Sequence, residues 1–97
     1  MPTYERSPQF DRDYAKLPSN LKERFRLAVR RFVDDLEAGH GFRSGLRVKG
    51  VQAAKGVFEL TWAPDGRATF IYGEPVVEGE PHIVWRRIGT HDILREP

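Results

Sequence analysis

The strongest constraint on the fold is a change in the spacing of apolar residues, from helical in the first half to alternating in the second. Between residues 21 and 36 the apolar side chains recur every three or four positions, and charged residues occupy the other side. This pattern predicts an amphipathic helix, and Gly39 and Gly41 mark its end. The apolar members are Leu21, Phe25, Ala28, Val29, Phe32 and Leu36.

A shorter helix is predicted before it. Ser7 followed by Pro8 is typical of a helix start, because serine caps free backbone N–H groups and proline at the first position loses no hydrogen bond. Apolar residues at helical spacing follow. Pro18 then ends the segment, since proline disfavours the helical conformation in the residue before it. Two helices joined by a short proline turn predict an antiparallel helical hairpin.

The second half of the chain predicts strands. Residues 57–62 alternate between apolar and polar side chains, as a half-buried strand does. Residues 64–66, Pro-Asp-Gly, predict a turn, because proline fixes φ and glycine accepts a positive φ. Residues 67–72 form the returning strand. A third strand covers residues 82–88, and Gly89 interrupts it.

The whole chain, residues 1–97, is therefore predicted to be a single α+β domain. In this domain the N-terminal helical hairpin packs on one face of a small antiparallel β-sheet. The chain has no cysteine, which excludes disulfides, thiolate metal sites and thiol nucleophiles. No apolar run is long enough to span a bilayer, so we expect no membrane contact and a cytoplasmic location.

Charge is distributed unevenly along the chain. Residues 1–50 carry 11 Lys or Arg against 7 Asp or Glu, whereas residues 51–97 carry 5 against 7. Residues 43–55 hold four cations and no acid, which are Arg43, Arg47, Lys49 and Lys55. Such a stretch favours contact with a phosphate backbone, and the alternative is a solvated loop.

Several short segments occur in a characteristic order. They are Phe10-Asp11-Arg12-Asp13-Tyr14 with Leu17-Pro18, Leu46-Arg47-Val48-Lys49, Val57-Phe58-Glu59-Leu60, Arg67 through Tyr72, and Arg87-Ile88-Gly89-Thr90-His91. Over nearly the whole chain this order resembles the RelE/ParE toxin superfamily of type II toxin–antitoxin systems. The ending at residues 89–94 most resembles the YafQ branch, in which a Gly-Thr-His segment provides a catalytic histidine. The resemblance implies a ribosome-dependent mRNA endonuclease, without metal or cofactor, that is neutralised by an antitoxin.

Cutting RNA without a metal requires proton transfer at the 2′-OH and the leaving oxygen, and stabilisation of charge on the phosphorus. On the resemblance, we expect His91 to be the general acid or base, because its ordinary pKa of roughly 6.5 lies near working pH. Arg67 is expected to stabilise the phosphate through its planar fork, with Arg86 or Arg87 assisting. The residues expected to hold the RNA backbone are Arg47, Lys49 and Lys55.

The chain departs from the family at the general base. The lysines that RelE carries on its second strand are Glu59 and Thr61 here, and the acid of YoeB-type toxins falls near Ser44 or Gly45. Glu59 or Asp92 could supply the missing group. Two alternatives keep the fold: a ParE-like inhibitor that binds DNA gyrase without chemistry, and a degenerate relative that retains only antitoxin binding.

Overall fold

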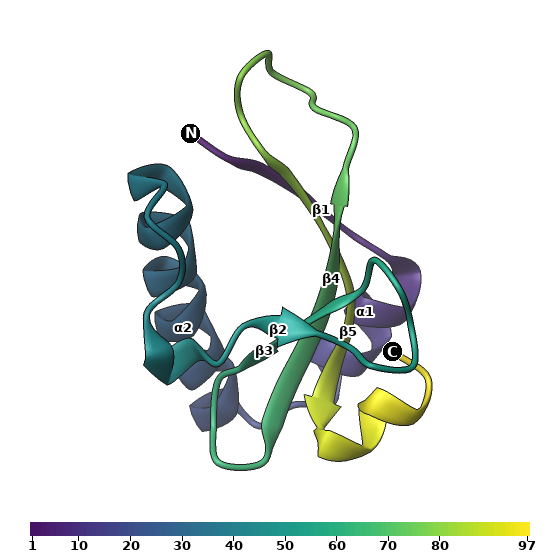
Figure 1. The fold of residues 1–97 in the computed structure, drawn as a ribbon. Coiled ribbons are helices and arrows are strands. Elements are labelled where there is room, and N and C mark those ends of the chain that lie inside the picture. The colour runs from purple at the N-terminus through teal and green to yellow at the C-terminus, as the bar shows by residue number, and fades with distance from the viewer.

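Two α-helices and a five-stranded sheet make up the computed structural model, which describes all of residues 1–97 (Figure 1). The strand order in the sheet is β1-β5-β4-β3-β2. The α+β prediction is confirmed. In chain order the elements are β1 (Thr3–Arg6), α1 (Pro8–Ala15), α2 (Ser19–Ala38), the 3₁₀ helix η1 (Ser44–Leu46), β2 (Lys49–Gly50), β3 (Phe58–Thr61), β4 (Gly66–Gly73), β5 (His82–Thr90) and the 3₁₀ helix η2 (His91–Arg95).

α1 begins and α2 ends where the sequence marks these boundaries, whereas α1 ends at Ala15, before Pro18. Ser7 Oγ accepts a hydrogen bond from the Phe10 N–H at 3.0 Å, and Pro8 is the first residue of α1. The same hydroxyl donates to the Arg86 carbonyl at 2.8 Å, which ties the start of α1 to β5. Gly39 ends α2 in the left-handed conformation, with φ of 73°. No helix has the length and apolar character that crossing a bilayer requires.

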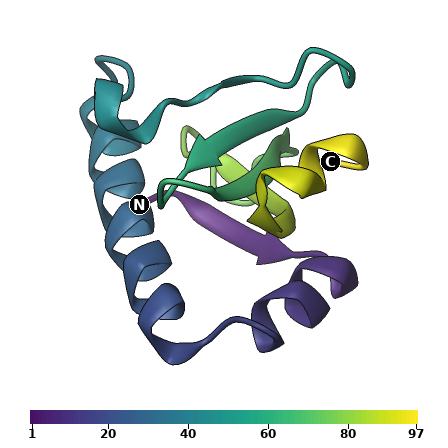
Figure 2. The ribbon, with the colours of Figure 1, turned by 90° about the horizontal axis from the view of Figure 1, so that it is seen from below.

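The two helices diverge from the turn that joins them rather than running side by side (Figure 2). The rings of Phe10 in α1 and Phe25 in α2 lie 5.9 Å apart, and both pack on Trp85 of β5, at 6.1 and 5.6 Å. Each helix therefore packs on the sheet through its own aromatic residues. The predicted antiparallel helical hairpin does not describe this arrangement.

The sheet is mixed, so the prediction of a wholly antiparallel sheet was wrong for one strand. β2 to β5 are antiparallel, but β1 pairs in parallel with β5, from Thr3 opposite His82 to Arg6 opposite Trp85. Side chains support this register, because His82 contacts Thr3 Oγ1 at 2.7 Å and Glu5 Oε1 at 2.8 Å. Two helices and three strands separate β1 from β5 along the chain, so no hairpin turn reveals this pairing in the sequence.

A β-bulge in β5 changes which residues face the core. Thr69 pairs with Arg87 and the next residue, Phe70, pairs with Trp85, so Arg86 has no partner in β4. The bulge reverses the alternation of β5, and apolar side chains on both sides of it are buried on one face. β5 also continues to Thr90, so the predicted interruption at residue 89 does not occur.

The core lies between the helices and the sheet. The rings of Phe32, Phe70 and Trp85 are mutually in contact, with centroids 5.1 to 5.5 Å apart and tilted or edge-on geometry. Gly66 borders this core for a steric reason: a Cβ there would lie 2.6 Å from Cε2 of the Trp62 indole. Gly66 does not have a positive φ, so close approach of the indole, and not the turn conformation, requires glycine.

Beyond the bulge, α1 replaces β1 at the edge of β5. The Asp13 carboxylate accepts from the Arg87 Nε at 2.8 Å and from the Ile88 N–H at 3.2 Å. Burial raises the pKa of Asp13, but hydrogen bonds from Arg87, Gln9 and Ile88 outweigh this and bring it below its ordinary 3.8. Asp13 thus satisfies an exposed strand edge and anchors α1 against β5.

We predict that Asp13→Asn lowers the free energy of unfolding by about 2 kcal/mol near neutral pH, because charge-assisted hydrogen bonds are lost. A depressed pKa stabilises the fold above the unfolded-state pKa of about 4, and this contribution disappears as pH falls through the folded-state value. Urea unfolding at about pH 6 and about pH 2.5 should therefore show the difference from wild type narrowing in acid.

Asp11→Asn is the matched control. Asp11 lies in the same helix, but its pair with Arg6 is solvent-exposed, so the substitution should change stability little. The difference in free energy of unfolding between Asp13→Asn and wild type could instead stay constant with pH. That result would mean that packing at this position matters and the charge does not.

Candidate nucleic-acid interface

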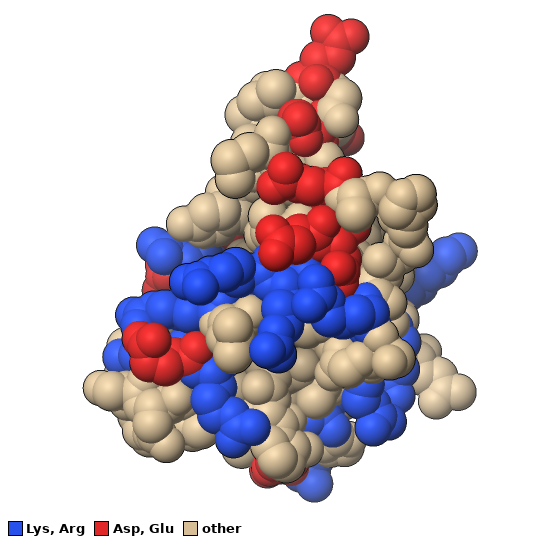
Figure 3. Space-filling model, turned by 90° about the vertical axis from the view of Figure 1, so that its left-hand side faces the viewer, with Lys and Arg blue, Asp and Glu red and all other residues tan.

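Lys and Arg side chains form a band across the side of the molecule that α2 presents (Figure 3). Acidic side chains gather above this band, toward the loop of residues 74–81. That loop contains Glu74, Glu78 and Glu80. The surface is therefore divided into basic and acidic regions far more sharply than the net charge of +2 suggests.

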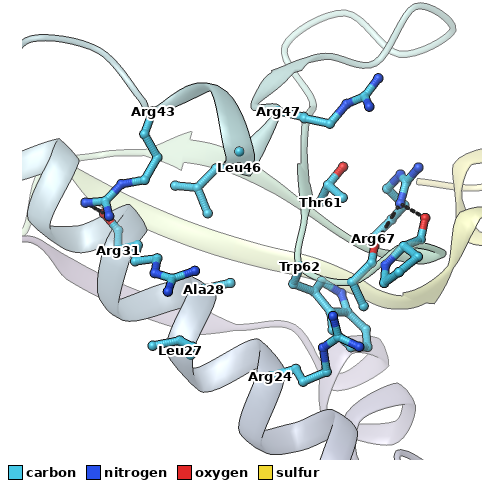
Figure 4. Close-up of a pocket in the computed structure, with 13 residues that line it drawn as sticks. Arg24, Leu27, Ala28, Arg31, Arg43, Leu46, Arg47, Thr61, Trp62 and Arg67 are labelled. Carbon is cyan, nitrogen blue, oxygen red and sulfur yellow. Dashed lines mark hydrogen bonds between the residues drawn. The ribbon is translucent and has the colours of Figure 1, made fainter.

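A pocket of about 420 Å³ opens between α2, η1 and the turn that joins β3 to β4 (Figure 4). Five arginines line it: Arg24 and Arg31 come from α2, Arg43 and Arg47 flank η1, and Arg67 comes from β4. We call this feature the arginine pocket. None of its lining residues is acidic; the others are Leu27, Ala28, Gly45, Leu46, Thr61, Trp62, Ala63 and Pro64.

Two of the five guanidinium groups are held by the protein itself. Arg43 donates from Nε and Nη2 to the Asp35 carboxylate at 2.9 and 2.8 Å. Hydrogen bonds from the Arg43 side chain and backbone lower the pKa of Asp35 to about 2, so the pair stays charged at physiological pH. Arg67 donates from Nη1 to the Gly66 carbonyl at 3.0 Å. The guanidinium groups without a hydrogen bond or ion pair are those of Arg24, Arg31 and Arg47.

Arg67, a predicted catalytic residue, is mostly buried beside an acid. Its Nε lies 4.0 Å from Glu59 Oε1, and the two side chains are only 16% and 9% exposed. Cross-strand pairing of Glu59 with Thr69 and of Thr61 with Arg67 places the four polar residues in neighbouring positions on β3 and β4. The Thr69 hydroxyl is buried and has no hydrogen-bond partner.

His91, the other main candidate, begins η2 directly after β5. Its side chain is exposed and makes no hydrogen bond, and Thr90 caps η2 by accepting from the Asp92 N–H at 3.3 Å. Arg67 pairs with Gly89, two residues before His91, so both candidates lie at the same end of the β4–β5 pair. His91 lies outside the arginine pocket.

The remaining predicted residues fall into two groups. Arg87 is bound to Asp13 and to the Glu96 carbonyl at 3.1 Å, and Arg86 donates to the Pro97 carbonyl at 3.2 Å. The three cations expected to hold RNA are all exposed and without an ion pair. They are Arg47, Lys49 and Lys55, of which Lys49 lies on the edge strand β2 and Lys55 in the following loop.

Sequence reasoning missed two residues of the pocket, Arg24 and Arg31. Their spacing of seven residues places them on the same side of α2, which is a signal that a helical projection contains. What the sequence does not reveal is that η1 and the β3–β4 turn lie across from that side of the helix.

The backbone of Arg47 adopts the left-handed conformation, with φ of 48°, which residues other than glycine rarely do.

The sequence matches no protein-family model and no curated protein. Solved structures do resemble the chain, at low sequence identity. RelE in the RelB–RelE antitoxin–toxin complex of Methanococcus jannaschii is 13% identical with a TM-score of 0.60, and the match covers 94% of each chain. YafQ in the E. coli DinJ–YafQ complex is 16% identical with a TM-score of 0.62, over 96% of each chain. A copper-bound mutant toxin from Helicobacter pylori is 11% identical with a TM-score of 0.64, over 95% of this chain and 97% of the other. The chain therefore has the fold of the RelE- and YafQ-like toxins.

Proposed function

We propose that the protein is the toxin of a type II toxin–antitoxin system and acts as a ribosome-dependent, metal-independent mRNA endonuclease that inhibits translation. The observation that carries the proposal is His91, exposed and unpaired at the end of β5 in a toxin fold, at the same end of the β4–β5 pair as Arg67. A protein that acts on translating ribosomes works in the cytoplasm.

The proposed chemistry divides the steps among a few side chains. His91 transfers a proton to or from the ribose and the leaving oxygen, and its exposure lets it reach a bound RNA. Arg67 stabilises the charge that develops on the phosphate. Asp92, exposed beside His91, is the better candidate for the second proton transfer, because Glu59 is buried against Arg67.

Other cations have supporting roles. Arg87 is already bound by Asp13, so we assign it to positioning β5 and η2 rather than to contact with the phosphate. The RNA backbone is held by exposed cations without an ion pair, namely Arg47, Lys49 and Lys55, and by Arg86, which is exposed although its guanidinium donates to the Pro97 carbonyl.

We predict that ribosome-bound mRNA is cut in the ribosomal A site by wild type, and that His91→Ala slows cleavage by about 10²-fold or more. Arg67→Ala should slow it as well, because charge on the phosphate is no longer stabilised. Mapping the cut sites by primer extension, with rates from a time course, measures both effects. His40→Ala is the matched control, since His40 is an exposed histidine after α2, away from the proposed chemistry.

The outcomes separate the alternatives. Cleavage by His91→Ala at the wild-type rate would move the acid–base role to another residue, and Asp92→Asn would be tested next. A folded wild type that leaves mRNA intact would contradict the nuclease. Inhibition of DNA gyrase supercoiling would then identify a ParE-like protein, and inactivity in both assays a degenerate relative.

We further propose a cognate antitoxin as partner. An apolar groove of about 400 Å³ lies between β1, α1 and α2, and Arg6 and Arg26 are the only charged residues in its lining. Tyr4, which contributes to it, is 64% exposed. Such a groove accommodates an acidic amphipathic segment that folds on binding. The product of a neighbouring open reading frame is the natural candidate.

We predict that Tyr4→Ala weakens binding of that antitoxin by about tenfold or more, because exposed aromatic anchors contribute strongly to interfaces. Titration calorimetry with the purified neighbouring gene product measures the change. Tyr72→Ala is the control, since Tyr72 is also an exposed tyrosine but lies outside the groove. Equal binding by Tyr4→Ala and wild type would place the antitoxin on another surface.

A further inference from the structure

The arginine pocket contains hydrogen-bond donors for which the protein provides no acceptors. Three of its guanidinium groups make no hydrogen bond or ion pair, and no acidic side chain lines it. Trp62 also lines the pocket, but it is only 7% exposed and its indole N–H is buried without a hydrogen-bond partner. The unpaired guanidinium groups, which do line the pocket, therefore favour a ligand with several acceptor atoms.

The Trp62 ring, which forms part of the pocket wall, is held in a fixed position. The indole packs edge-on against Phe25 with ring centroids 6.1 Å apart, and the close approach of Gly66 leaves no space for it to shift toward the turn. Arg67 and Arg43 are held by their own hydrogen bonds on either side. The pocket is therefore organised before any ligand binds.

The distribution of the free arginines decides what kind of anion fits. Arg24 and Arg31 are separated by about 10 Å along the axis of α2, given a rise of about 1.5 Å per residue. In Figure 4 the side chains of Arg24 and Arg31 extend from α2, whereas that of Arg47 points away from the helix, so the three do not converge on one point. A single carboxylate or phosphate cannot satisfy all three, whereas an extended polyanion can.

We propose that the arginine pocket binds the phosphate backbone of single-stranded RNA on the α2 side of Arg67, next to the bond that is cut. This inference rests on the proposed function for the identity of the polyanion. The basic band in Figure 3 continues across the face that α2 presents, as the path of a nucleic-acid strand requires. Because Trp62 is buried, its ring is not available for stacking, so the pocket binds the backbone without base preference.

The test measures RNA binding independently of cleavage. In a His91→Ala background and without ribosomes, affinity for a fluorescent oligouridylate is measured by anisotropy over a range of salt concentrations. We expect Arg24→Gln/Arg31→Gln to weaken binding at least tenfold. The slope of log K against log salt should fall by about 1.4, which is about 0.7 for each phosphate that the protein no longer neutralises.

Lys22→Gln/Arg30→Gln is the matched control, because it removes two cations from α2 that have no ion pair and lie outside the arginine pocket. It should weaken binding less than threefold. Equal losses of affinity in the two double variants would overturn the proposal, since general surface charge would then explain binding. Preferential binding of polyglutamate over RNA by the pocket would also overturn it and would identify an acidic protein segment as the occupant.

The Trp62 indole N–H provides a second measurement. In ¹⁵N-labelled protein its signal, assigned with Trp62→Phe, should shift on addition of oligouridylate, while the Trp85 signal stays in place. The shift should be absent in Arg24→Gln/Arg31→Gln. Normal mRNA cleavage with an unmoved Trp62 signal would reject the pocket and leave the nuclease intact. A moved signal in a protein that cuts no mRNA would retain the pocket and reject the nuclease.

Discussion

The bulge at Arg86 is the constraint on which the rest of the structure depends. It lets one edge of β5 form hydrogen bonds with two different elements, β1 before the bulge and α1 after it. Before the bulge, β5 pairs with β1 on one side and β4 on the other. After it, β1 has ended and Asp13 of α1 binds the strand edge. The reversed alternation keeps Trp85 and Ile88 on the same buried face. The direction of β5 past the bulge in turn determines where His91 emerges beside the β3–β4 turn.

The sequence predicts the elements well because each has a local signal. The 3.6-residue period defines α2, Ser7 and Pro8 define the start of α1, and alternation defines β3 and β4. The parity of β5 is ambiguous in the sequence, since two successive arginines, Arg86 and Arg87, cannot both face solvent in a regular strand. A bulge resolves that ambiguity, but its position depends on tertiary pairing, which no local pattern reports. The parallel pairing of β1 and the divergence of the helices are non-local for the same reason.

Prediction of the candidate site had the same limits. His91 and Arg67 were identified through resemblance and residue chemistry, and the strand register explains why they lie at one end of the sheet. The arginine pocket could not be predicted, because α2, η1 and the β3–β4 turn come together only in the fold. Gly66 illustrates the difference: its turn motif predicts a positive φ, whereas the structure needs glycine so that Trp62 can approach.

Pairing of acids with particular arginines explains how a protein of net charge +2 can bind a polyanion. Asp35 neutralises Arg43, Asp13 neutralises Arg87, and Glu59 lies close to Arg67. Each of these pairs fixes part of the scaffold: the end of α2 to η1, α1 to β5, and β3 to β4.

Three of the arginines left without acids, Arg24, Arg31 and Arg47, line the pocket between α2 and the sheet. Attraction of a phosphate backbone depends on such unpaired charges and not on the total, since a paired guanidinium contributes little field at a distance. A backbone-binding surface on the α2 side of Arg67 does not include His91, so His91 stays free to act on the nucleotides that the ribosome presents. Binding and cleavage can then be altered by separate substitutions.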